Sequence, residues 1–358
     1  MKNVIKNIPS GTRDLIYEEA LIPGKIEDTL LDIYFRLGYK PVSTPELEYY
    51  KTFDHDKNDI NEESIFRFSD MDGKTLALRP DNTSPVVRVA MSKLKDEKLP
   101  LLLCYSQNVF RNIKAFHAKR SQMLQSGVEI IGGDKHEEDM RCIFTALEAL
   151  KICGKKAKLE IGHASFFDAL IAEYEIDEED KNNLRSYIAA KNSGEYPFTT
   201  ALKNQKAVEL ASSLQRLFGT TEVLERAQKL ASGNQKALEI LDYIGKTVDE
   251  FTKAGYGDML IIDLGIVQKI EYYTGLVFRG YVDGIGEAVL SGGRYDNLLL
   301  AFGSDLSACG FGLNISAVSE LHSATLPGYS PLSFSAGAED IRKAAKYLHP
   351  DIEKEDRT

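Results

Sequence analysis

Hydrophobic positions follow two periods along the chain, and each period predicts one kind of element. Apolar and polar residues alternate on both sides of Asp72-Gly73, which predicts a β-hairpin over 65–79 because an Asp-Gly pair suits a tight hairpin turn. Apolar residues three and four positions apart predict amphipathic helices over 22–37 and 137–152. Further strands are expected at 158–161 and 259–263, and a further helix from Ser84 towards Lys95.

The segment 101–133 is the strongest candidate for a ligand-binding surface. Apolar runs at 101–105 and 126–131 predict two antiparallel strands, joined by a loop rich in basic and amide side chains. Inward-facing Arg, Gln and Glu side chains on this hairpin would form a floor for a small anionic or zwitterionic ligand. A solvated hairpin with scattered charge explains this segment, taken alone, equally well. The loop side chains are Arg111, Lys114, His117, Lys119, Arg120 and Gln122.

Polar residues follow the second strand of the 65–79 hairpin, just before the expected helix. Asp81 and Thr83 would lie at a sheet end, where polar side chains can take up the amine of a ligand. In the alternative interpretation, Thr83 or Ser84 caps the helix.

Residues 164–255 differ in character from the chain on either side. Acidic and lysine-rich helical patterns alternate there with short polar breaks, without a strand pattern of comparable strength, which predicts a helical insertion between two parts of a sheet domain. After it, Tyr272 and Tyr273 would point to opposite faces of an extended segment, so only one would line a given pocket from a strand. Gly292-Gly293 is predicted to form a turn that feeds a helix. The paired glycines would also allow close approach of a backbone, and tight packing explains them equally well.

Composition and charge exclude several classes of protein. With 43% hydrophobic residues among 358, the chain can bury a real core, and its net charge of -10 argues against a surface that tracks a phosphate backbone. No phosphate-binding loop, dinucleotide fingerprint or HExxH motif is present, and the six dispersed histidines predict no metal site. Four cysteines without a CxxC pair, no signal-peptide pattern and no long apolar run predict a cytoplasmic protein with buried thiols.

Several of these stretches resemble, in order, the catalytic core of class II aminoacyl-tRNA synthetases, and specifically histidyl-tRNA synthetase. The resemblance covers about 9–163 and 258–320, and it implies an α+β fold with an antiparallel sheet flanked by helices. It divides the chain into a core of 1–163 and 256–320, a helical insertion of 164–255 and a short tail of 321–358 without the anticodon-binding domain. The motifs that carry it are PSGTRD, YKPVSTPELE (motif 1, the family's dimer interface), LRPDNTSPVVR, VFR with QSGVE (motif 2), IEYYTGLVF, and SGGRYDNLL with GFGL before motif 3.

Three departures affect the family's ATP site. Ile113 stands where an acidic residue recognises adenine, Gln268 where the catalytic arginine precedes the tyrosine pair, and Ala317 where an arginine clamps the γ-phosphate. Loss of one preorganised donor usually costs ~10²–10³ in rate, so we expect no amino-acid activation.

The amino-acid half of the family's site is largely kept. By position, the resemblance assigns the α-amino group to Asp81 and Thr83, the carboxylate to Arg111 and Gln125, and the imidazole to Glu129 with Tyr272 or Tyr273. Asp81 replaces the family's Glu and is one methylene shorter.

This selective loss resembles the regulatory subunits of short-form ATP phosphoribosyltransferase. The resemblance implies a non-catalytic homodimer, formed through the motif 1-like segment, that joins a separate catalytic subunit at the first step of histidine biosynthesis and responds to histidine as effector. It implies no cofactor, and it argues against tRNA as a partner. One alternative is a divergent histidyl-tRNA synthetase in which Lys269, Arg279 or Arg294 replaces the lost cations. Another is a synthetase-like protein with a different amino-acid-binding role.

Overall fold

The computed structural model describes residues 6–54, 60, 62–113, 120–154, 156–190, 205–267 and 272–324. Residues Met1–Ser323 cluster as one compact unit. The sequence beyond residue 324, which includes most of the expected tail of 321–358, lies outside the described residues.

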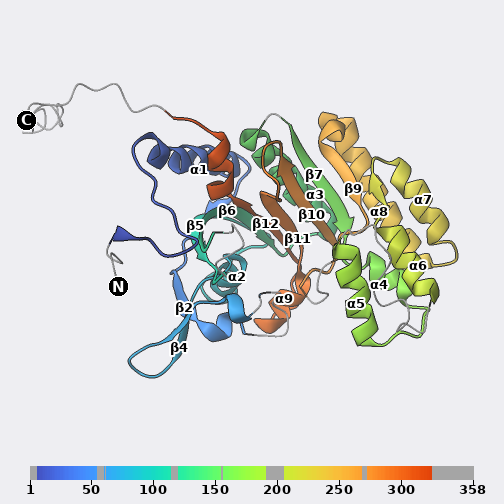
Figure 1. Cartoon of the computed structure of the whole chain (residues 1–358), viewed down its shortest axis with the longest axis horizontal. Helices are drawn as coiled ribbons and strands as arrows, with labels where there is room; N and C mark the ends of the chain where they lie inside the picture. The colour runs from blue at the N-terminus through green and yellow to red at the C-terminus, as the bar shows by residue number, and fades with distance from the viewer. Residues whose placement is uncertain are drawn as a thin grey trace, which may run out of the picture. The chain divides into compact units, whose positions relative to one another are not determined.

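A nine-stranded sheet forms the centre of this unit (Figure 1). Its neighbouring strands are antiparallel except for β1 with β5 and β7 with β9, which are parallel. The α+β class and the mainly antiparallel sheet are therefore confirmed. In order across the sheet, the strands are β1 (Lys40–Pro41), β5 (Leu101–Phe110), β6 (Gln122–Ile131), β12 (Ala308–Asn314), β11 (Leu290–Arg294), β10 (Leu276–Val282), β7 (Ala157–His163), β9 (Leu260–Asp263) and β8 (Phe218–Gly219).

The strands β5 and β6 form the hairpin predicted at 101–131, but each is ten residues long. The prediction stopped at residue 105 because polar residues follow there. Gln107 is nevertheless buried, since its Oε1 accepts hydrogen bonds from the backbone N of Thr44 at 2.8 Å and from Nη1 of Arg79 at 2.9 Å. These hydrogen bonds satisfy Oε1 inside the protein, while Nε2 of Gln107 is buried without a partner among the described residues.

Amphipathic helices cover the sheet where the apolar spacing predicted them. The helices α1 (Glu18–Arg36) and α3 (Lys135–Cys153) contact each other and the strands of the sheet. Asp134 caps α3 by accepting hydrogen bonds from the backbone N of His136 and Glu137, both at 3.0 Å. The other helices of this part are α2 (Thr83–Ser92), α9 (Asp296–Ala301), α10 (Ile315–Val318), and the short turns η2 (Tyr50–Thr52), η3 (Glu62–Ser64) and η6 (Ser319–Leu321).

The predicted 65–79 hairpin belongs to a separate three-stranded sheet, ordered β2 (Leu47–Tyr49), β4 (Thr75–Leu78) and β3 (Arg67–Ser69). Asp70 closes its turn by accepting hydrogen bonds from the backbone N of Asp72 at 2.9 Å and of Lys74 at 2.8 Å. Gly73 has a φ of 78°, which a residue with a side chain rarely adopts. The last strand in sequence, β4, ends shortly before α2 begins at Thr83.

Helices dominate the described part of 164–255, and the two-residue strand β8 is an element that the sequence did not predict. Within the described residues, no helix combines the length and apolarity needed to cross a membrane. The elements here are α4 (Phe166–Ile171), α5 (Glu178–Ala189), α6 (Gln205–Leu214), α7 (Glu222–Leu230), α8 (Gln235–Phe251), η4 (Thr252–Tyr256) and η5 (Gly257–Met259).

The predicted glycine turn at Gly292-Gly293 is wrong, because both residues lie inside β11. A Cβ on Gly292 would lie 2.4 Å from the carbonyl O of Gly310 on β12 and 2.5 Å from Cβ of Phe311. The glycines therefore serve close packing of adjacent strands. The helix that they were expected to feed is α9.

Candidate ligand-binding site

A cavity of about 1100 Å³ lies over β6 and β12. Residues from several separate stretches line it, among them the start of α2, the β5–β6 hairpin, the segment before β10, the segment from the β10–β11 loop to Tyr295, and β12 with the helix after it. The lining includes six of the predicted site residues, namely Asp81, Thr83, Arg111, Gln125, Tyr272 and Tyr273. The structure thus brings together side chains up to almost two hundred positions apart in the sequence.

Two glycines of β12 make room for the functional side chains of β6. A Cβ on Gly310 would lie 1.9 Å from Oε2 of Glu129, and a Cβ on Gly312 would lie 2.3 Å from Nε2 of Gln125. Residues two apart on a strand share one face, as do residues four apart. The GFG sequence of β12 and the Gln125 to Glu129 spacing of β6 therefore form one matched surface.

Glu129 lies beneath this surface and does not itself line the cavity. It is 1% exposed and accepts hydrogen bonds from the hydroxyls of Thr83 at 2.8 Å, Tyr105 at 3.3 Å and Tyr295. Burial raises the pKa of the Glu129 carboxyl to about 8, although the hydroxyl donors oppose this shift. Thr83, Tyr105 and Tyr295 line the cavity, so Glu129 orients the groups that a ligand would meet.

Asp81 closes the first turn of α2. Its carboxylate accepts a hydrogen bond from the backbone N of Ser84 at 2.8 Å, whereas Thr83 uses its hydroxyl for Glu129. The alternative that Thr83 or Ser84 caps the helix is therefore wrong. Burial raises the pKa of Asp81, while the Ser84 hydrogen bond and the positive charge of Arg111 oppose that shift.

Arg111 and Gln125 each form a hydrogen bond with the segment just before α2. Nε of Arg111 donates to the carbonyl O of Pro80 at 3.1 Å, and no described residue forms an ion pair with this guanidinium. Oε1 of Gln125 accepts from Nδ2 of Asn82 at 3.0 Å. Asn82 is fully buried and was not among the predicted site residues.

Tyr272 and Tyr273 both line the cavity, which departs from the expectation for an extended segment. Both precede β10, so strand alternation does not govern them. Their ring centroids lie 4.6 Å apart at an interplanar angle of 87°, and Tyr272 stacks on Tyr295 at 5.6 Å and 23°. Gly293 allows this arrangement, because its Cβ would lie 2.8 Å from Cδ1 of Tyr273.

Two of the three positions at which the resemblance places lost ATP contacts lie at the same cavity. Ile113 and Ala317 line it, and Gln268 lies outside the described residues. This part of the lining still contains charged side chains, but Arg120 forms an ion pair with Glu320 and is thus partly neutralised. An apolar Ile113 cannot accept a hydrogen bond from an adenine amino group.

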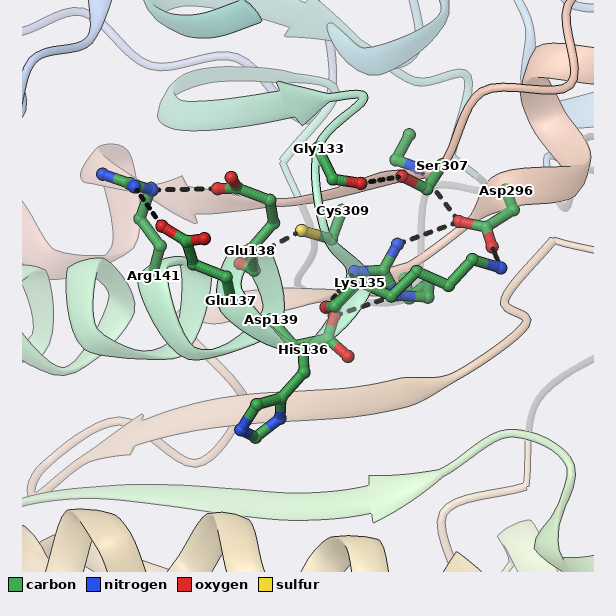
Figure 2. Close-up of polar contacts among 12 residues, drawn as sticks. Gly133, Lys135, His136, Glu137, Glu138, Asp139, Arg141, Asp296, Ser307 and Cys309 are labelled. Carbon is green, nitrogen blue, oxygen red and sulfur yellow. Dashed lines mark hydrogen bonds and ion pairs between the residues drawn. The ribbon is translucent and has the colours of Figure 1, made fainter. Parts of the chain in front are cut away.

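Two of the cations named as replacements for the lost arginines, Arg279 and Arg294, do not line the cavity. Arg294 is buried, with Nη2 2.7 Å from Oδ1 of Asp139 and Nη1 3.1 Å from Oδ1 of Asp296. Lys135 also binds Asp296, at 2.7 Å, and Figure 2 shows these acidic groups converging between α3 and the start of α9. Arg279 is likewise not a lining residue, and Lys269 lies outside the described residues. Within the described ranges, no group of three His, Cys, Asp or Glu side chains is placed to hold a metal ion.

Comparisons with known proteins support the family resemblance seen in the motifs. The family model for histidyl-tRNA synthetase matches residues 11–318. An ATP phosphoribosyltransferase regulatory subunit of Clostridium acetobutylicum is 40% identical over 321 residues, which cover 88% of this chain and 78% of that protein. The chain belongs to the family of ATP phosphoribosyltransferase regulatory subunits.

Further relatives support the same family assignment. A regulatory subunit of Bacillus cereus is 36% identical over 87% of this chain and 74% of its own length. A crystal structure of an ATP phosphoribosyltransferase regulatory subunit/histidyl-tRNA synthetase from Bacillus halodurans has a TM-score of 0.81 at 32% identity, covering 89% of this chain and 84% of that one. Histidyl-tRNA synthetase from Nostoc, at 18% identity and a TM-score of 0.77, shares the fold. The resemblance inferred from the motifs is confirmed.

Proposed function

We propose that this protein is a non-catalytic, histidine-binding regulatory subunit that acts on a separate ATP phosphoribosyltransferase subunit in the first step of histidine biosynthesis. The proposal rests on a difference between two parts of one cavity: one part keeps its polar side chains, and the other has lost two of the expected ATP contacts. The part around Asp81, Thr83 and Gln125 has polar groups arranged for a zwitterion, while Ile113 and Ala317 line the part that would hold ATP.

Histidine has one cationic, one anionic and one aromatic group, and the cavity offers a counterpart to each. Asp81 and the hydroxyl oxygen of Thr83 are acceptors for the ammonium group. Arg111 and Gln125 are donors for the carboxylate. The tyrosine rings beside them offer aromatic surface and hydroxyls for the imidazole, which has one donor and one acceptor nitrogen.

The ATP part of the cavity supports a non-catalytic role. Adenylation needs cations on the phosphates, and Arg120 is already paired with Glu320 while Arg294 is held by Asp139. A triphosphate placed here would have to break these pairs or lack its clamps.

Regulation in this proposal follows from differential affinity. Histidine that binds one state of the complex better than another shifts the population towards that state, and the catalytic subunit responds. We propose that the chain forms a homodimer through α1 and the adjacent segment up to β2. The four cysteines are free and buried, which suits a reducing cytoplasm.

The test is calorimetry of the full chain with L-histidine and, separately, with Mg-ATP. We expect histidine to bind and ATP not to bind. Thr83→Val removes one hydroxyl from the histidine part and should weaken histidine binding by about 10-fold, since one hydrogen bond to a charged group contributes about 1.5 kcal/mol or more. Ile113→Ala, at the same cavity but in the ATP part, is the matched control and should leave histidine affinity unchanged.

A second measurement addresses the partner. Adding the full chain to a purified ATP phosphoribosyltransferase catalytic subunit should make its activity depend on histidine concentration. ATP-pyrophosphate exchange catalysed by the pure protein in the presence of histidine would contradict the proposal and favour an active synthetase.

A further inference from the structure

The amide of Gln125 is held in one of its two possible orientations. Nδ2 of Asn82 donates to Oε1 of Gln125 at 3.0 Å and lies 3.5 Å from the backbone carbonyl O of Gln107. A backbone carbonyl can only accept, so the NH₂ group of Asn82 must face Gln107. The same NH₂ group then requires the carbonyl side of Gln125 to face Asn82.

Two acceptors face the NH₂ group of Asn82, so turning its amide would place Oδ1 against the carbonyl O of Gln107. Asn82 is fully buried, and its backbone carbonyl accepts a hydrogen bond from the backbone N of Val86 at the start of α2. Arg79 holds the neighbouring strand β5, with Nε donating to the carbonyl O of Asn108 at 2.6 Å and Nη1 to Oε1 of Gln107 at 2.9 Å. The backbone acceptor that Asn82 meets thus belongs to a strand held by Arg79, whereas Oδ1 of Asn82 and Nε2 of Gln107 are buried without a hydrogen-bond partner among the described residues.

The other side of the Gln125 amide therefore presents its NH₂ group to the cavity. Gln125 lines the cavity, and its Nε2 lies against Gly312, another lining residue, where a Cβ would come within 2.3 Å. No described residue accepts a hydrogen bond from Nε2, and this nitrogen is not among the buried polar atoms that lack a partner. It is thus a donor open to a ligand.

We propose that Asn82 is a positioning residue that makes Gln125 a fixed hydrogen-bond donor and so selects amino acids with a free carboxylate over the corresponding amino alcohols. The inference rests on the proposed function, because it concerns the same site. A fixed NH₂ group attracts a carboxylate, whereas a freely turning amide also offers its carbonyl, which repels one. Asn82 acts only through Gln125 in this proposal, and that dependence can be measured.

The experiment compares the dissociation constants of L-histidine and L-histidinol, which has an alcohol in place of the carboxylate. The quantity of interest is the preference, the constant for histidinol divided by that for histidine. It is measured for the wild type, Asn82→Leu, Gln125→Ala and the double variant. Asn82→Leu has no donor for Gln125, and we expect it to lower the preference by about 10-fold, the size of one hydrogen bond to a charged group. In the Gln125→Ala background the same substitution should leave the preference within about 2-fold.

Controls separate this role from simple loss of structure. Asn112→Leu changes another amide that lines the cavity, but Nδ2 of Asn112 donates to the carbonyl O of Glu63 and not to Gln125, so this substitution should leave the preference unchanged. Asn82→Asp, which keeps the side-chain size, replaces Asn82→Leu in the same cycle if the leucine variant does not fold. If Asn82→Leu weakens the binding of both ligands equally, this inference is overturned. The same holds if Asn82→Leu lowers the preference as much in the Gln125→Ala background as in the wild type. Neither result contradicts the proposed function. Absence of histidine binding by the wild type overturns the proposed function together with this inference.

Discussion

The buried carboxyl of Glu129 should make the stability of this protein fall as the pH rises towards 8. Glu129 ionises near pH 4.5 in the unfolded chain, whereas burial raises its pKa to about 8 in the folded protein. Between these values the folded state holds a proton that the unfolded state has released. Stability from this group is therefore fully present below about pH 4.5 and is lost as the pH rises through about 8.

The substitution Glu129→Gln should remove this dependence. Gln has nearly the same shape and does not ionise, and the hydroxyls of Tyr105, Tyr295 and Thr83 can rotate to meet either side of its amide. One proton held across the whole interval gives a slope of about 1.4 kcal/mol per pH unit. Between pH 6 and pH 8 the wild type should therefore lose about 2 kcal/mol of unfolding free energy relative to the variant.

The assay is urea denaturation of both proteins at about pH 6, 7 and 8, with the difference between them plotted against pH. Taking the difference cancels the titration of groups that do not interact with Glu129. Asp81 does interact with it, because the negative charge of Asp81 raises the pKa of Glu129, so this pair contributes to the difference together. A difference that stays constant over this interval would show that Glu129 is ionised throughout, and the argument from burial would fail.

Two further substitutions test the frame around the cavity. Arg294→Met leaves the buried Asp139 without its cation and should cost about 3–5 kcal/mol in urea denaturation, while adding Asp139→Asn to the same chain should recover much of the loss; a single-variant loss under about 1 kcal/mol would contradict this. Gly310→Ala should cost about 1–3 kcal/mol and weaken histidine binding, because its Cβ meets Glu129 and the carbonyl O of Val128. Gly286→Ala is the control, since a Cβ there has nothing within 4 Å, and equal stabilities of the two glycine variants would refute the packing argument.

Local sequence patterns were sufficient to predict the helices and strands that bury one face. The helices α1 and α3 and the β3–β4 hairpin follow from residues close together in the sequence, so their periods predicted them. Gln125 and Glu129 were assigned through the resemblance of QSGVE to motif 2, which also supplied their partners.

Sequence patterns did not reveal contacts that depend on non-local pairing. Tyr295 reaches Glu129 only because β12 and β11 pair beside β6, and Asn82 reaches Gln125 only because α2 packs over β6. Tyr105 looks like an ordinary apolar strand residue until its hydroxyl is seen to face Glu129. The glycines of β11 look like a turn because nothing local shows that another strand's backbone lies against them.

Contacts around Arg294 connect the helical segment 164–255 with the residues around the cavity. From α8, the hydroxyl of Tyr243 donates to Oδ2 of Asp139 at 2.8 Å, and Asp139 in turn holds Arg294. The next residue, Tyr295, supports Glu129, and the carbonyl O of Arg294 accepts from the backbone N of Thr274, beside Tyr273. A displacement of α8 from α3 would thus remove the Tyr243 hydroxyl from Asp139, whose ion pair holds Arg294 between the cavity-lining Tyr273 and Tyr295 segments, so the position of α8 bears on the shape of the cavity.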